Sequence, residues 1–187
     1  MTSSRLHLAA PLTDESTLRL QAGDHARVSG KVYVARDAAH KRMFEALAQG
    51  QALPFDPAGQ IIYYMGPSPA RPGHPIGSAG PTTSYRMNPY TEPLLRAGIK
   101  GFIGKGERSE AVYRALREYK AIYLIAIGGA GALIAQSIRR AEVIAYPDLG
   151  PEALRCLDVM DLPLIVGYDG YGQDIYQVGR ALYRQPK

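Results

Sequence analysis

Short apolar runs alternate with amphipathic segments through the second half of this chain, and this alternation limits the fold more than any other feature. Each run is short and bounded by glycine or charged residues, which is typical of a buried strand. The strands predicted in this half lie at 100–103, 121–127, 143–146 and 162–168. Strands that alternate with helices favour an α/β layer fold.

The segments between these strands predict helices. Ser109 is placed to cap a helix whose apolar residues share one stripe. The glycine-rich turn at 128–131 leads into a helix predicted to end near Arg139 and Arg140, because cations suit a helix C-terminus. A short helix is predicted over 151–157.

The first half is less regular. Asp37 is placed to cap a helix over 38–48, and Gly50 is placed to end it. Alternating or short apolar stretches predict strands at 17–20, 28–35 and 61–65.

Length and charge narrow the function classes. The chain has 187 residues, which fits one domain over 1–187. Its longest apolar run, 121–127, is far short of the roughly 20 residues that cross a bilayer. The N-terminal segment holds one arginine and a short apolar patch, so we expect neither a membrane span nor a secretory leader. The net charge of +5 permits a nucleic-acid partner, but the basic residues form no long block, and we expect none.

Cys156 is the only cysteine in the sequence. One thiol cannot form an intrachain disulfide, a four-cysteine zinc site or an iron–sulfur site by itself. We therefore expect no metal ligands in this chain and a cytoplasmic location. Cys156 is expected to be a small buried residue of the 151–157 helix.

The segment 66–93 is rich in proline and glycine and shows neither a helical nor a strand period. Such a long irregular stretch in a compact domain is usually functional or disordered. Because a flexible linker would be more uniformly rich in serine and glycine, we interpret this segment as a functional loop.

Two glycine-rich turns resemble nucleotide-binding loops but fail in detail. The turn 127–132 (IGGAGA) lacks the third glycine of the dinucleotide fingerprint, because Ile134 stands there. The segment 101–106 (GFIGKG) lacks the hydroxyl residue after its lysine and the four-residue spacer before it, which excludes a P-loop.

Two cations at predicted strand ends are ambiguous. Lys105 lies between glycines, where it is either a point charge for an anion or a solvated loop residue. Arg36 lies beside a predicted helix N-terminus, where it either binds a carboxylate or only pairs with Asp37.

The segment 80–87 (GPTTSYRM) carries the strongest chemical signal. Thr82, Thr83 and Ser84 offer hydroxyl and backbone donors to an anion on a turn set by proline. Arg86 adds a fork of donors that suits a carboxylate. The alternative is that the hydroxyl residues only cap a helical turn.

Together these stretches resemble the iron–sulfur hydro-lyase family of class I fumarases and L-tartrate dehydratases, specifically its β subunit or C-terminal region. Several matching pieces are specific in order and spacing, and GPTT-x-x-R-M is the sharpest. The matching stretches are 28–42, 53–67, 77–87, 98–109, 125–138 and 145–154.

The resemblance implies a swivelling β/β/α-type single domain that works with a separate α subunit. In this family the α subunit holds a 4Fe–4S cluster through three cysteines, and its open iron acts as a Lewis acid on the substrate. The β chain closes over the site and binds the rest of the dicarboxylate. An α2β2-type assembly in which two β chains pair is also expected.

The resemblance also implies roles for particular residues. By match, Arg36, Arg86 and Lys105 bind carboxylate, and Thr83 is assigned to substrate binding with them. Thr82 matches the proposed proton-abstracting residue. A free alcohol is a poor base, so Thr82 would need neighbours that stabilise its alkoxide.

Two departures from the family pattern bear on the substrate. Asn88 stands where fumarase-like members often have aspartate, and Ser84 and Tyr85 replace a smaller pair. We expect fumarate and malate as substrates first and L-tartrate second. A hypothesis of a different class is a non-catalytic anion-binding module on the same scaffold.

Overall fold

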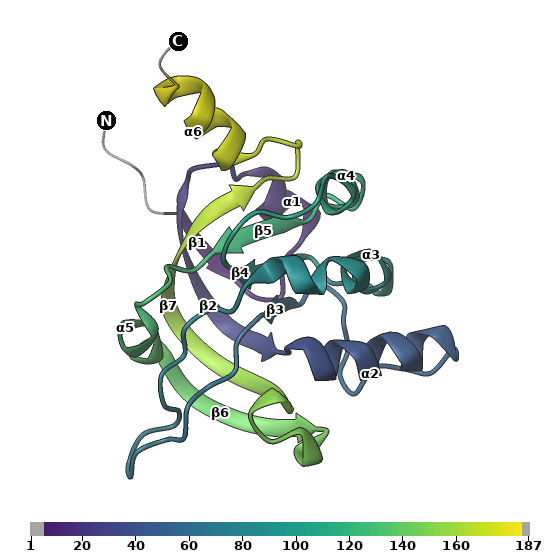
Figure 1. The fold of residues 1–187 in the computed structure, drawn as a ribbon, viewed down its shortest axis with the longest axis vertical. Coiled ribbons are helices and arrows are strands. Elements are labelled where there is room, and N and C mark those ends of the chain that lie inside the picture. Colours follow the sequence, from purple (N-terminus) through teal and green to yellow (C-terminus); the bar gives the residue numbers. More distant parts are fainter. Residues whose placement is uncertain (1–5, 185–187) are drawn as a thin grey trace.

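The computed structural model describes residues 6–184, so residues 1–5 and 185–187 of the predicted domain lie outside it. The chain forms a mixed α/β domain whose seven strands make one sheet in the order β1-β2-β3-β4-β5-β7-β6. An additional pairing of β2 with β7 closes part of this sheet into a small barrel (Figure 1). The predicted α/β class is confirmed.

Five of the strands run parallel to one another. They are β1 (Leu6–Ala9), β2 (His25–Val34), β3 (Ile61–Tyr63), β4 (Gly101–Gly104) and β5 (Ile122–Ile125). β3 and β4 are buried along their whole length, which explains why their sequences are continuous apolar runs rather than alternating ones. Because these strands are parallel, their carboxyl ends meet at one edge of the sheet.

Two antiparallel strands complete the sheet. β7 (Leu154–Tyr168) pairs with β5, with β2 and with β6 (Ile138–Ala145). Its length allows this, since its last residues bond to β5 while its first residues bond to β6. β7 is therefore the strand that closes the barrel.

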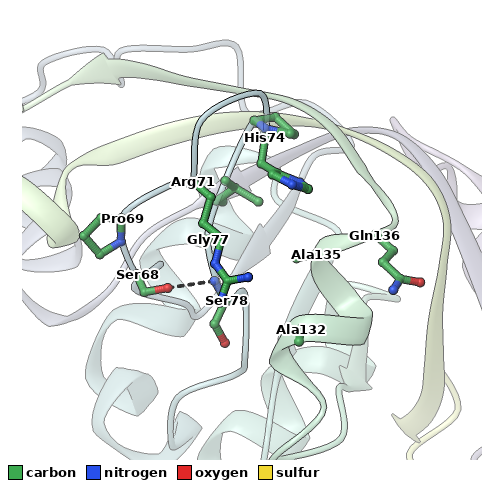
Figure 2. A pocket seen from close by; sticks show the side chains of 11 residues that line it. Ser68, Pro69, Arg71, His74, Gly77, Ser78, Ala132, Ala135 and Gln136 are labelled. Atoms are coloured by element: carbon green, nitrogen blue, oxygen red, sulfur yellow. Dashed lines mark hydrogen bonds between the residues drawn. The ribbon is translucent and has the colours of Figure 1, made fainter.

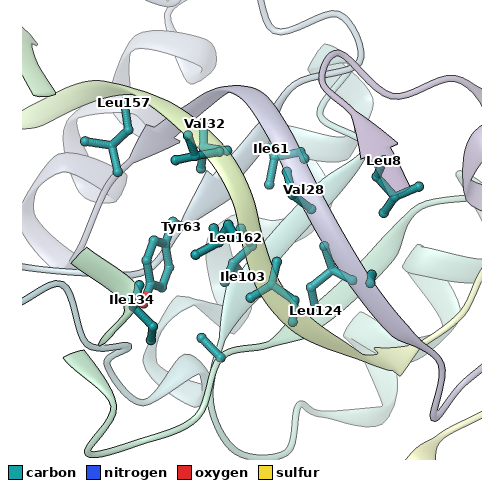
Figure 3. Packing of buried hydrophobic residues seen from close by; sticks show 14 of the residues in the cluster. Leu8, Val28, Val32, Ile61, Tyr63, Ile103, Leu124, Ile134, Leu157 and Leu162 are labelled. Carbon is teal, nitrogen blue, oxygen red and sulfur yellow. The ribbon is translucent and has the colours of Figure 1, made fainter. Parts of the chain in front are cut away.

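Side chains along the strands alternate between two apolar cores. One core fills the barrel, and Figure 3 shows Ile61 and Leu124 within it. The other core lies on the outer face of the sheet and includes Ile62 and Tyr123. Successive residues of a strand point to opposite faces, so adjacent residues belong to different cores.

Three helices cover the outer core. α2 (Asp37–Ala48), α3 (Asn88–Ala97) and α4 (Glu110–Glu118) lie side by side, with α3 in the middle (Figure 1). The cap predicted for α4 is confirmed, because the Ser109 hydroxyl accepts from the amide of Val112 at 3.5 Å. The remaining helices are α1 (Asp14–Leu18), α5 (Gly131–Ala135) and α6 (Ile175–Tyr183). Over residues 6–184, none of the helices has the length and apolar character needed to span a membrane.

The strand predicted at 17–20 is wrong, because this segment belongs to α1 and the turn after it. Thr13 and Ser16 form a capping box at the start of α1. The buried residues Thr17 and Leu20 are three apart, which is a helical spacing. The Thr17 hydroxyl also donates to the carbonyl of Lys120 at 2.7 Å, which ties α1 to the start of β5.

The helix predicted at 151–157 is also wrong. A short 3₁₀ segment, η2 (Pro147–Glu152), precedes β7, and Cys156 lies on that strand. Leu154 and Leu157 share a helix-like spacing of three, but in a strand this odd spacing sends them to opposite faces. Leu154 packs in the outer core and Leu157 in the barrel.

The helix after the glycine-rich turn ends earlier than predicted. α5 ends at Ala135, and Arg139 and Arg140 lie on β6, where both are exposed. Their role at a helix C-terminus is therefore wrong, because pairing with β7 extends the strand back to Ile138.

The segment 66–93 is irregular only in its first part. Residues 66–81 form an excursion in which the amide of Ser78 donates to the Ser68 hydroxyl at 2.8 Å. The rest contains a 3₁₀ turn, η1 (Ser84–Met87), and the start of α3. Pro89 lies in the first turn of α3, where a missing amide proton costs nothing, so proline did not exclude a helix there.

Candidate active site

The predicted site residues gather at the edge of the sheet where the parallel strands end. Arg36 follows β2, Tyr64 follows β3, Lys105 follows β4 and Gly128 comes soon after β5. In open α/β sheets, ligands bind outside the carboxyl ends of the strands. The topology therefore places four separate segments around one location.

The GPTTSYRM segment crosses this edge between β3 and β4. The amide of Thr82 donates to the carbonyl of Tyr64 at 2.8 Å, and the amide of Ser84 donates to the carbonyl of Lys105 at 3.1 Å. Thr83 and Lys105 form an isolated parallel bridge. These backbone contacts fix both ends of the hydroxyl run.

The buried side chain of Ser84 fixes the GPTTSYRM segment in place. Its buried hydroxyl accepts from the amide of Lys105 at 3.0 Å and lies 2.9 Å from the Tyr123 hydroxyl. A side chain at Gly104 could not be accommodated, since its Cβ would lie 1.9 Å from the Ser84 oxygen. With Ser84 turned inward, Thr82 and Arg86 remain on the outer side.

Arg86 connects the segment to α2 and to Thr82. Its Nε and Nη2 donate to the two carboxylate oxygens of Asp37 at 2.8 and 3.2 Å. Nη2 also donates to Thr82 Oγ1 at 2.9 Å. In the described part of the chain, these bonds leave both Nη1 protons of Arg86 for a further acceptor.

This geometry suits two tasks at once. A cation that donates a hydrogen bond into a hydroxyl oxygen stabilises the deprotonated form of that hydroxyl. The remaining Nη1 donors of Arg86 can bind a carboxylate next to Thr82. The alternative in which Thr82 and Thr83 cap a helical turn is not what forms, because η1 has Thr83 at its N-cap with no side-chain cap bond.

Arg36 lies against Gly66, where a Cβ would come within 2.7 Å of its guanidinium. Its Nη2 is 3.5 Å from Glu152 and 3.8 Å from Asp37, so pairing with Asp37 is only part of its environment. Asp37 does not act as the side-chain cap of α2. Glu152 does so instead, accepting from the amide of Ala38 at 2.9 Å. Among the described residues, the buried Nε of Arg36 has no partner.

Lys105 and Thr83 face the same edge by a different route. The Lys105 side chain lies near Gly128, whose Cβ position is 3.8 Å from Nζ. Thr83 is exposed, and its hydroxyl bonds to no residue within 6–184. The structure brings Thr82, Arg86 and Arg36 together through Asp37, and it places Lys105 and Thr83 beside them through the backbone. Their roles toward a substrate stay predictions.

The carboxyl group of Asp37 is ionised in this setting. Burial acts to raise its pKa, but the hydrogen bonds from Arg86 and from its own backbone, with the charges of Arg86 and Arg36, outweigh burial and leave the pKa lowered. The site therefore holds a fixed carboxylate between two arginines at neutral pH.

Sequence reasoning missed a buried arginine behind the site. Arg108 donates to Asn88 Oδ1 at 2.7 Å, to the Tyr64 hydroxyl at 3.2 Å and to Thr91 Oγ1 at 2.6 Å. Its guanidinium also lies over the rings of Tyr64, Phe102 and Tyr123. Arg108 is part of the GKGERS stretch, but a lone arginine in a loop gives no sign that it will be buried.

The residues of this chain do not fit an iron–sulfur cluster. Within residues 6–184, no three His, Cys, Asp or Glu side chains are grouped so that they could hold a metal ion. Cys156 is half-buried on β7, and burial raises the pKa of its thiol, which disfavours the thiolate that iron requires.

A separate hollow of about 360 Å³ lies between the 66–81 excursion and α5 (Figure 2). Its walls contain one arginine and one histidine, and the candidate site residues are not part of its lining. The residues that line it include Ser68, Arg71, His74, Ser78, Ala132 and Gln136. At the candidate site, Thr83 and Arg86 are exposed, and Arg36, Thr82 and Lys105 are partly exposed.

Comparison with known proteins gives the family. The model described as fumarase C-terminus matches residues 1–179. The chain belongs to the fumarase C-terminus family. This confirms the resemblance found in the motifs.

Named relatives of this family differ in how much of them the chain covers. It is 37% identical over 181 residues to a putative L(+)-tartrate dehydratase subunit beta of Methanocaldococcus jannaschii, with 93% of each chain covered. It is 39% identical over 152 residues to the anaerobic class I fumarate hydratase of Escherichia coli, covering 80% of this chain and 28% of that one. A putative class I fumarate hydratase of Geobacillus stearothermophilus is 36% identical, with 91% of this chain and 33% of the relative covered. The chain thus spans a third or less of these fumarases.

Proposed function

We propose that residues 1–187 form one hydro-lyase β-type domain, the β subunit of a 4Fe–4S-dependent enzyme that adds water to fumarate to give malate. The observation that carries this proposal is the contact between Arg86 and Thr82, in which a guanidinium donates into a hydroxyl oxygen at 2.9 Å. The class I fumarate hydratases among the relatives support the choice of reaction.

In this proposal the chain supplies the cations and the proton-transfer group. Arg86, Arg36 and Lys105 bind the carboxylates of the substrate, and Thr83 contributes a donor. In the direction of dehydration, the Thr82 oxygen takes the proton from the carbon beside one carboxylate, and hydroxide leaves the neighbouring carbon. In hydration, the Thr82 hydroxyl returns that proton to the carbon while the oxygen of water bonds to the neighbouring carbon, and the proton that this water loses restores the Thr82 hydroxyl.

An alcohol is a weak base, and the neighbours of Thr82 compensate for this by stabilising its alkoxide. The cation of Arg86 favours the alkoxide, and it does so from a fixed position because Asp37 holds it. Closure of the site by a partner would exclude water and strengthen both effects.

The cluster is proposed to belong to an α subunit, because the residues of this chain do not fit one. When bound there, it supplies Lewis-acid chemistry. We propose an α2β2-type assembly in the cytoplasm, with neither nucleic acid nor membrane as a partner. The word subunit in the name of the Methanocaldococcus relative supports a multi-chain enzyme.

Dehydration of L-tartrate is a second candidate. It is favoured by the relative named as a tartrate dehydratase β subunit, which matches this chain over 93% of both lengths. The same cations and the same threonine would serve, since malate and L-tartrate are both dicarboxylates with a hydroxyl group.

The test is to co-express this chain with a cluster-bearing α subunit, purify the complex without oxygen, and assay fumarate, malate and L-tartrate. We expect turnover of fumarate and malate by the complex and none by either chain alone. Turnover of tartrate only would select the second candidate. A complex that binds dicarboxylates without turning any over would mean that the domain is a non-catalytic anion-binding module.

A further inference from the structure

Asp37 gives both of its carboxylate oxygens to Arg86, a residue 49 positions away in the chain. It lies at the start of α2, while Arg86 lies on η1. A bidentate pair of this kind fixes the plane of the guanidinium as well as its position. Asp37 thereby determines where the remaining donors of Arg86 point.

The fold has little need of this pair. The cap of α2 is provided by Glu152, so the Asp37 carboxylate is not required for it. The side chains of Asp37 and Arg86 are 38% and 46% exposed, and ion pairs as open as this usually contribute little to stability. A pair that does little for the fold, yet joins α2 to the site, points to a role in the site.

The pair with Asp37 also determines where the remaining Nη2 proton of Arg86 points. With Nε and one Nη2 proton bound to Asp37, the second Nη2 proton is aimed at Thr82 Oγ1. Without the carboxylate, the long Arg86 side chain would sample many rotamers, and its bond to Thr82 would form only part of the time.

We propose that Asp37 is a positioning residue that holds Arg86 in the orientation where it both donates to Thr82 and presents Nη1 to a substrate carboxylate. This inference rests on the proposed function and deepens it. Asp37 does not touch the reacting atoms, and it acts through Arg86.

The opposite role is that Asp37 stands in for a substrate carboxylate and must be displaced. The two roles predict effects of opposite sign. If Asp37 positions Arg86, its loss lowers kcat. If it competes with substrate, its loss lowers KM and leaves kcat intact.

The test compares Asp37→Asn and Asp37→Glu in the assembled enzyme, each also in an Arg86→Ala background. We expect Asp37→Asn to lower kcat/KM about 10–100-fold, mainly through kcat, as loss of a group that orients an active-site residue does. Asp37→Glu should recover most of this loss. In the Arg86→Ala background, Asp37→Asn should cost less than about 2-fold, because a residue that acts only through Arg86 has nothing left to position.

A fall in KM with unchanged kcat, an unchanged enzyme, or a full and additive loss in the Arg86→Ala background would each overturn the proposal. The matched control is Asp148→Asn, which breaks another exposed and doubly bonded arginine–carboxylate pair, at Arg42. It should leave both kinetic constants unchanged.

A second readout does not depend on activity. In the full chain alone, the Arg86 Nε–H signal observed by NMR should shift on Asp37→Asn and return toward its original position in Asp37→Glu. A signal that stays in place would overturn the positioning contact. If the wild-type complex turned over no dicarboxylate while this signal moved, the proposed reaction would fail and the positioning contact would stand.

Discussion

Arg86 and Arg108 both bond to residues of the stretch 82–91, but their surroundings are opposite. Arg86 is half-exposed and pairs with a carboxylate, Asp37. Arg108 is buried, and among residues 6–184 its guanidinium bonds only to neutral oxygens, those of Asn88, Tyr64 and Thr91, while aromatic rings cover it. Arg86 keeps guanidinium donors for a further acceptor, whereas the side-chain donors of Arg108 are directed into the protein.

The difference indicates that Arg86 is arranged to bind a ligand and that Arg108 is arranged to support the fold around it. A buried cation must satisfy its donors internally, because unpaired polar groups in the interior are costly. An open cation at the end of a sheet keeps donors for a ligand. Arg108 therefore holds Tyr64 and Asn88 in place behind the site, and Arg86 is the arginine that we propose binds the substrate.

The largest expected effect tests the half-exposed region around Arg86, through the hydroxyl groups of Thr82 and Thr83. Thr82→Val keeps the shape of the side chain and removes the oxygen that receives the Arg86 bond. We expect kcat of the assembled enzyme to fall by roughly 10²–10⁴-fold, the usual contribution of a positioned proton-transfer group. Thr83→Val is the matched control and should do much less. Equal and small losses in the two variants would move the base to the partner subunit.

The next effect tests the buried side. Arg108→Met keeps the apolar stem but leaves three acceptors, two buried and one part-buried, without their donor. We expect the free energy of unfolding to fall by about 3 kcal/mol or more, measured by denaturant titration. Arg42→Met is the control, because Arg42 also lies over a tyrosine ring, but it pairs with a carboxylate and is exposed. It should change the free energy of unfolding far less than Arg108→Met does. Similar costs for the two would remove the distinction between the regions.

A pH titration sharpens the picture of the buried side through His40. Burial, opposed by a bond to the Arg36 carbonyl and aided by the charge of Arg108, lowers the pKa of His40 from 6.5 to about 4. The unfolded chain therefore takes up a proton below pH 6.5 that the folded chain refuses until about pH 4. Stability should be fully present above pH 6.5 and should fall by up to about 3 kcal/mol as the pH drops to 4.

His40→Asn should remove this dependence between pH 6.5 and 4. His25→Asn, in which the replaced ring is exposed, is the control and should retain it. A stability profile of the wild type that is flat over this range would mean that His40 is protonated without penalty in the fold.

The smallest expected effect concerns Cys156, which belongs to neither region. Because it lies half-buried on β7, opposite Tyr33 of β2 rather than opposite a candidate site residue, Cys156→Ser should change kcat by less than about 2-fold and stability by about 1 kcal/mol. Enzyme assay and thermal unfolding of the assembled complex measure both. Complete loss of activity in a folded variant would mean that the thiol takes part in the reaction.

The sequence predicted the parts of the fold whose pattern is local. The buried strands β3, β4 and β5 and the amphipathic helix α4 follow from short apolar runs and from one capping serine. The errors occurred where a local pattern fits two structures. Leu154 and Leu157 have helical spacing, but they lie on a strand that pairs with β2 and β6, and only the assembled sheet decides between the two.

The candidate site divides in the same way. Motif order predicted Thr82 and Arg86 as neighbours, since four residues on a turn are close in any compact conformation. The partners that hold the cations come from elsewhere in the chain. Glu152 contacts both Ala38 and Arg36. It is 114 residues away from Ala38 in the sequence, and no local pattern predicts such a contact.

The measurement that most directly tests the division between the two arginines is the activity of Arg86→Ala and Arg86→Lys in the assembled enzyme, with unfolding of each variant measured alongside. Loss of a charge-assisted bond costs about 1.5–3 kcal/mol, so we predict that Arg86→Ala lowers kcat/KM by roughly 10–150-fold while its free energy of unfolding changes by less than about 1 kcal/mol. Arg86→Lys should recover only part of the activity, because an ammonium group lacks the planar fork that bonds to both oxygens of Asp37 and also donates to Thr82. Full activity of the lysine variant, or a loss that follows unfolding rather than binding, would contradict the account.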